Sequence, residues 1–152
     1  MKPETPRSSS AADHQIAWRS TYKWFSLFMA ITFAAVGLFF LFLADDVLTF
    51  FDRFSPIFGM IPSSGEGYGF YLILAVGYMY LVTLLAVFMY REPANRYFPL
   101  LLMNAKVASS VLSFALLAFH RPYLIYLVNG VVDGLIALAV LVFYLKLRPG
   151  KA

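Results

Sequence analysis

Two long apolar stretches separated by only three residues decide the fold: residues 98–119 read FPLLLMNAKVASSVLSFALLAF and residues 123–145 read YLIYLVNGVVDGLIALAVLVFYL. Each is long enough to cross the roughly 30 Å hydrocarbon core of a bilayer, which takes about 20 helical residues. Two further stretches, residues 24–44 and 70–90, are equally apolar and carry no charged side chain. All four are predicted to be helices, because an open strand would leave backbone polar groups unpaired in lipid.

The composition excludes several classes of protein. Of the 152 residues 61% are hydrophobic and only 13% charged, with a mean hydropathy of +0.74, whereas soluble domains carry about a quarter of charged residues. The lack of cysteine excludes disulfide exchange, thiolate metal sites, iron–sulfur clusters and covalently attached c-type haem. Basic residues lie beside the apolar stretches rather than in one stripe, so no nucleic-acid partner is expected.

The predicted fold is all-α: a four-helix transmembrane bundle with up-down-up-down topology, in a single membrane domain over residues 13–148. Residues 1–12 are rich in Ser and Pro, which predicts a disordered polar tail. Between the first two spans, residues 45–56 bring Val47, Phe50, Phe51 and Phe54 to one helical face. That pattern is typical of a short helix lying in the outer interface.

The distribution of positive charge predicts the orientation. Nine of the 12 Lys and Arg residues fall on the side of the two termini and the second loop, while Arg53 and Arg121 fall on the other side. Positively charged loops face the cytoplasm, so both termini are predicted to be cytoplasmic. The nine residues are Lys2, Arg7, Arg19, Lys23, Arg91, Arg96, Lys146, Arg148 and Lys151.

Opposite charges in the third and fourth spans are the most informative feature. Lys106 lies 15 residues before Arg121 in the connecting turn, and Asp133 lies 12 residues after it. At 1.5 Å per residue their depths differ by about 4–5 Å, so a lysine side chain can reach the carboxylate. Because an unpaired charge at a helix centre costs about 2.5–3.5 kcal/mol, the two are expected to pair.

A set of small and polar residues accompanies this pair. Serines follow Lys106 at helical spacing, Asn129 shares a face with Asp133, and Tyr78 of the second span is expected to complete the cluster, ahead of its neighbours Tyr80 and Thr83. Ser113 matches Gly130 in depth and Ser109 matches Gly134, which predicts close antiparallel packing of the last two spans. The predicted intramembrane polar cluster is Lys106, Ser109, Ser110, Ser113, Asn129, Asp133 and Tyr78, with Gly130 and Gly134 as packing residues.

Three interpretations of the charged pair stay open. The pair can be a structural staple that sets the register of the two helices. Alternatively, it can mark a proton-linked or ligand-binding site near the midplane, as intramembrane ionisable groups often do. In the third interpretation, Lys106 snorkels to the cytoplasmic interface and never meets Asp133.

The remaining polar residues indicate no catalytic constellation and no metal site. His14 and His120 fall on opposite sides of the membrane, so they cannot hold one haem between them. The acidic residues Asp45, Asp46, Asp52 and Glu66 of the outer loop are expected to cap and solubilise the interfacial helix. Asn104 lies roughly opposite the serines on its predicted helix, so it is expected to face another helix or a partner subunit. In the first span Ala30, Ala34 and Gly37 are expected to form a packing face.

The four-span plan over residues 20–148 resembles the DoxX-like group of small bacterial membrane proteins. The resemblance rests on Asn104-Ala105-Lys106-Val107-Ala108-Ser109-Ser110 in the third span and Val131-Val132-Asp133-Gly134-Leu135 in the fourth. Together with the small size of the chain, it implies a location in a bacterial inner membrane. It also implies that some relatives are accessory subunits of redox or quinone-linked complexes. It assigns no functional residue to this chain, and the lack of cysteine argues against a thiol-redox role.

The leading hypothesis is a non-catalytic accessory subunit or assembly factor of a larger membrane complex, with no cofactor of its own. Its expected partners are the lipid bilayer and other membrane subunits or further copies of itself. A small proton-linked carrier that uses Lys106 and Asp133 is the alternative. A quinone-binding accessory subunit is a third hypothesis, which rests on the resemblance and on the 16 Phe and 10 Tyr residues.

Overall fold

The computed structural model describes residues 7–62 and 69–146, and the described chain is helical apart from short connections. Its elements are α1 (Arg7–Phe42), α2 (Ala44–Phe54), the 3-10 helix η1 (Ser55–Phe58), α3 (Gly69–Arg91), α4 (Tyr97–Phe119) and α5 (Leu124–Lys146). Four of them contain segments long and apolar enough to cross a membrane: Ala17–Phe42, Tyr71–Arg91, Tyr97–Phe119 and Leu124–Lys146. The chain is therefore a small polytopic membrane protein built as a helical bundle.

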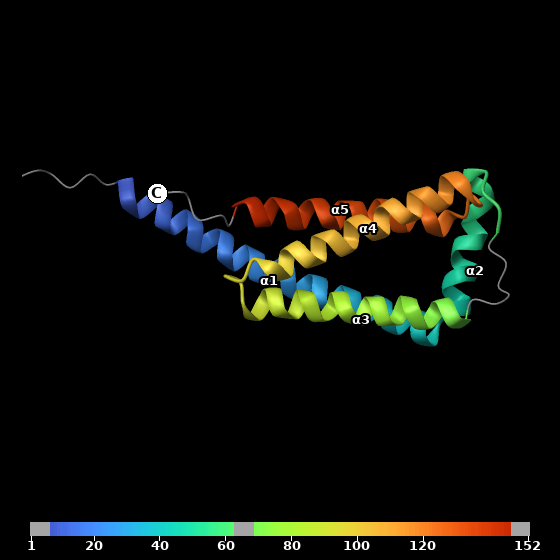
Figure 1. The fold of residues 1–152 in the computed structure, drawn as a ribbon, viewed down its shortest axis with the longest axis horizontal. Helices are drawn as coiled ribbons and strands as arrows, with labels where there is room; N and C mark the ends of the chain where they lie inside the picture. Colours follow the sequence, from blue (N-terminus) through green and yellow to red (C-terminus); the bar gives the residue numbers. More distant parts are fainter. Residues whose placement is uncertain (1–6, 63–68, 147–152) are drawn as a thin grey trace, which may run out of the picture.

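The first helix is longer than the sequence predicted. It spans 36 residues, about 54 Å at 1.5 Å per residue, and its first turns extend beyond the bundle in Figure 1. Residues 7–12, predicted as part of a disordered tail, are helical, because Pro6 is the last helix-breaking residue before the first span and the helix continues back to that point. Residues 1–6 lie outside the described residues.

The bundle consists of two closely packed helix pairs. The most extensive contacts join α4 to α5 and α1 to α3, while α3 meets α4 less extensively and α1 barely touches α5. The short helix α2 lies across one end of the bundle and contacts both α1 and α5 (Figure 1). At the opposite end lie the α3–α4 turn and the Lys146 end of α5.

The buried core joins the two pairs on the side of the α3–α4 turn. Its fully buried members come from all four long helices, and most other large side chains of the spans face outward, as expected for helices solvated by lipid. The core residues with essentially no exposed surface are Tyr22, Phe33, Val82, Ala86, Met89, Leu102 and Val140.

Candidate functional site

The charged pair is formed in the interior of the bundle. Lys106 Nζ on α4 lies 2.8 Å from Asp133 Oδ1 on α5, and the two side chains are 2% and 5% exposed. The ammonium group donates to the carboxylate, as the depth count from the α4–α5 turn predicts. Because both side chains are sealed from the surroundings, the lysine does not snorkel to the interface.

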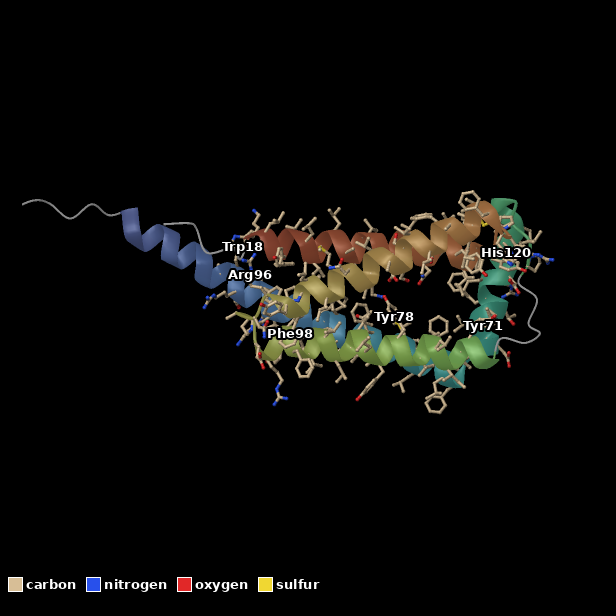
Figure 2. The ribbon with its side chains drawn as sticks, in the orientation of Figure 1. Trp18, Tyr71, Tyr78, Arg96, Phe98 and His120 are labelled. Atoms are coloured by element: carbon tan, nitrogen blue, oxygen red, sulfur yellow. The ribbon has the colours of Figure 1, made fainter. Side chains whose placement is uncertain are left out.

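Aromatic rings from the other helix pair cover the ammonium group. Lys106 Nζ lies 4.6 Å from the ring centroid of Phe33 on α1 and 5.1 Å from that of Tyr78 on α3. The Tyr78 hydroxyl donates to the carbonyl oxygen of Ala105 at 3.1 Å, and Figure 2 shows Tyr78 near the middle of the bundle. All four long helices therefore contribute to the site, and the cation is stabilised by ring faces as well as by the carboxylate.

The role of Phe33 is absent from the sequence prediction. It is one of 16 phenylalanines, and no spacing distinguishes it from those that face lipid. Only the packing of α1 against α3 brings its ring over the ammonium group of a residue more than 70 positions later.

The second carboxylate oxygen of Asp133 is the unusual atom of the site. Oδ2 is buried and accepts no hydrogen bond from the described residues. Most buried polar atoms have a partner, and an unpaired one costs roughly 1–3 kcal/mol. Oδ2 can thus accept a hydrogen bond from a small donor without disturbing the contact between Nζ and Oδ1.

Serine and asparagine side chains extend the contact between α4 and α5. Asn129 Nδ2 donates to Ser113 Oγ at 2.8 Å and to Ser109 Oγ at 3.2 Å. Ser110 Oγ donates to the carbonyl oxygen of Gly130 at 2.7 Å. The structure therefore brings all seven residues of the predicted cluster to the α4–α5 contact or its immediate neighbourhood.

The two glycines allow α4 and α5 to approach closely, but their partners differ from the prediction. A Cβ atom on Gly134 would lie 3.1 Å from Ser110 Oγ, and one on Gly130 would lie 3.1 Å from the ring of Phe114. The sequence paired them by depth with Ser109 and Ser113. The difference arises from the rotation of each helix about its own axis. Residues at equal depth meet only if both lie on the helix faces that are in contact, and here Ser110 is the serine that faces the glycines.

Neighbours of Tyr78 that were considered for the cluster lie outside it. Tyr80 is 66% exposed on the outside of α3. Thr83 donates its hydroxyl proton to the carbonyl oxygen of Met79, one turn earlier in the same helix. Of the small residues in the first span, Ala30 and Gly37 are buried and Ala34 is exposed.

Polar residues at other positions lie far from the site. His120 is exposed and lies at the same end of the bundle as Tyr71 (Figure 2). The side chain of His14 and the whole of Glu66 lie outside the described residues. Within the described ranges, no three His, Asp or Glu side chains gather into a group able to hold a metal ion.

Comparison of this chain with protein-family models, with curated proteins and with solved structures found no match. The resemblance to DoxX-like proteins thus stays a prediction from the residues.

Proposed function

We propose that this chain is a non-catalytic accessory subunit or assembly factor of a larger membrane complex, with up-down-up-down topology and both termini in the cytoplasm of a bacterium. The observation that carries the proposal is the position of Asn104. It lies seven residues after Tyr97, about 10 Å along α4, and its side chain is exposed on the outside of the bundle.

An exposed amide at this depth needs a partner. Asn104 Nδ2 donates to the carbonyl oxygen of Leu100 at 2.8 Å, and this is the one hydrogen bond that the amide makes to the described residues. Leaving polar groups unpaired in hydrocarbon costs a few kcal/mol. Asparagine side chains in transmembrane helices meet this need by hydrogen bonding to another helix.

The surface around Asn104 suits the approach of another helix. Ala108 and Val111 follow it at helical spacing, and both are exposed. A small residue at position 108 lets a partner backbone come close. By contrast, the polar side chains inside the bundle already form bonds between α4 and α5. These bonds fit a structural role, in which they hold the two helices together.

Gentle extraction of the chain at its native expression level, followed by native mass analysis, tests the proposal. We expect the chain in a complex with larger membrane proteins, and we expect Asn104→Leu to reduce the complex. Tyr80→Leu, which removes an exposed polar group from α3, is the matched control and should leave the complex intact. Recovery of the chain alone, with or without the substitution, would overturn the proposal.

One observation favours a second candidate, a small proton-linked carrier: the unpartnered and buried Oδ2 of Asp133. Intramembrane carboxylates mark proton pathways in many transporters. A pH-sensitive dye trapped in proteoliposomes should then report a protein-dependent proton flux that disappears in Asp133→Asn. Equal flux in the variant, or in protein-free vesicles, would exclude this candidate.

A further inference from the structure

A second polar site lies at the end of the bundle opposite α2. A cavity of about 270 Å³ lies between the first part of the α1 span, the α3–α4 turn and the last turn of α5. Figure 2 shows two residues of its lining, Trp18 and Arg96, close together at this end. Because these elements are the ends of spans, the cavity lies at the level of the membrane surface.

Three cations line this cavity: Arg19, Arg96 and Lys146. The described residues that line it include no carboxylate, and the cations form no ion pair with any described residue. The cavity therefore concentrates positive charge that the described chain does not neutralise.

Aromatic rings hold two of the cations in place. Arg96 Cζ lies 4.6 Å from the ring centroid of Tyr144, and Lys146 Nζ lies 4.6 Å from that of Trp18. Cation–π contacts of this kind orient a charged group without cancelling its charge. The positive groups are thus positioned in advance for an anion.

The buried hydroxyl of Tyr22 is an independent indication of a ligand. Tyr22 lines the cavity and is 1% exposed, and apart from the nearby side chain of Ser26 no described residue offers its hydroxyl a hydrogen-bond partner. Its neighbour Ser26 donates to the backbone carbonyl oxygen of Tyr22. A buried phenolic hydroxyl beside a cavity can donate a hydrogen bond to an acceptor atom of a bound ligand.

We propose that this cavity binds the phosphate group of an anionic lipid headgroup. A phosphate accepts hydrogen bonds from Arg, Lys and Tyr donors together, and basic pockets between transmembrane helices are suited to anionic headgroups. The volume lies just below the range of about 300–1,000 Å³ typical of whole small-molecule sites, so a headgroup fits while the acyl chains stay in the bilayer. This inference does not depend on the proposed accessory role.

Fluorescence of Trp18 provides the binding assay. The protein has two tryptophans, and Trp24 is 69% exposed and does not line the cavity, so Trp24→Phe leaves Trp18 as the reporter. The full chain in neutral detergent is titrated with phosphatidylglycerol, phosphatidylcholine or inorganic phosphate. We expect a saturable change with phosphatidylglycerol and none with phosphatidylcholine. A response to inorganic phosphate at the same concentrations would assign the site to the free anion instead of the lipid.

Substitutions separate a specific site from a general effect of charge. Arg96→Gln should weaken phosphatidylglycerol binding about tenfold, the loss expected for a hydrogen bond to a charged group. The matched control is Arg91→Gln, which removes an exposed arginine near the same turn that does not line the cavity. It should leave the affinity within about twofold, because screening weakens distant surface charges.

Tyr22→Phe tests the hydroxyl without changing the net charge, and should weaken binding several-fold while the helical circular dichroism stays unchanged. Equal losses in Arg91→Gln and Arg96→Gln, or the lack of a saturable response in the Trp24→Phe protein, would overturn the proposal.

Discussion

At the scale of single residues, the structure rests on charges and polar groups that satisfy one another inside the membrane. Lys106 is sealed in the bundle with one carboxylate oxygen and two ring faces around its ammonium group. Removing the carboxylate would leave a buried cation with only the rings to stabilise it. Removing both charges would leave no such cation, which makes the two residues a coupled unit.

Asp133→Asn should therefore lower the free energy of unfolding by about 3–5 kcal/mol, the loss measured when one partner of a buried ion pair is removed. The double variant Lys106→Met with Asp133→Asn should be more stable than the single variant. Unfolding in mixed micelles, followed by circular dichroism, measures both. A double variant less stable than the single one would contradict the expected coupling.

At the scale of elements, the close approach of α4 and α5 depends on glycines that face the other helix, and Gly134 shows why. A Cβ on Gly134 would lie 3.1 Å from Ser110 Oγ, which cannot easily yield because it donates to the Gly130 carbonyl oxygen at 2.7 Å. On α3, a Cβ on Gly77 would meet nothing within 4 Å. A side chain is thus restricted at Gly134 and not at Gly77, although both glycines are helical.

Gly134→Ala should destabilise the protein by about 1–3 kcal/mol, since the added methyl group forces α4 and α5 apart or breaks the Ser110 hydrogen bond. Gly77→Ala adds the same group to open space and should change stability by less than about 1 kcal/mol. Thermal unfolding of the two variants in the same detergent makes the comparison. Equal destabilisation would show that helix backbone effects, not the α4–α5 contact, decide the outcome.

At the scale of the whole molecule, the arrangement of the helices puts charged residues at two ends of one bundle. Arg19, Arg96 and Lys146 line one cavity at the end opposite α2. At the other end α2 carries Asp45 and Asp46 in its first turn. The positive-inside rule predicts that the first end faces the cytoplasm.

The lack of cysteine makes that orientation directly testable, because a single introduced cysteine has no background. Ala94→Cys lies in the α3–α4 turn and Thr49→Cys lies on α2, both at exposed positions. In intact spheroplasts a membrane-impermeant maleimide should label the second variant and not the first. The reverse pattern would place both termini outside.

The class of the protein and its four spans can be predicted from the sequence alone. The pairing of Lys106 with Asp133 was expected from the sequence, with a snorkelling Lys106 as the alternative. Hydrophobic length decides which segments enter a bilayer, and a turn of a few residues leaves two helices antiparallel, so depth follows from counting. The residue at which α1 starts could not be predicted from the sequence, because a polar stretch attached to a long helix can continue that helix.

Which helix faces meet across the bundle could not be predicted from the sequence. The ring of Phe33 over Lys106, the place of Ser110 against the glycines, and the cavity that gathers Arg19, Arg96 and Lys146 all depend on which faces meet. In a bilayer, an apolar helix face has a similar free energy against lipid and against another helix. Hydrophobic pattern therefore cannot choose between faces, and the choice falls to packing shape and to a few polar contacts.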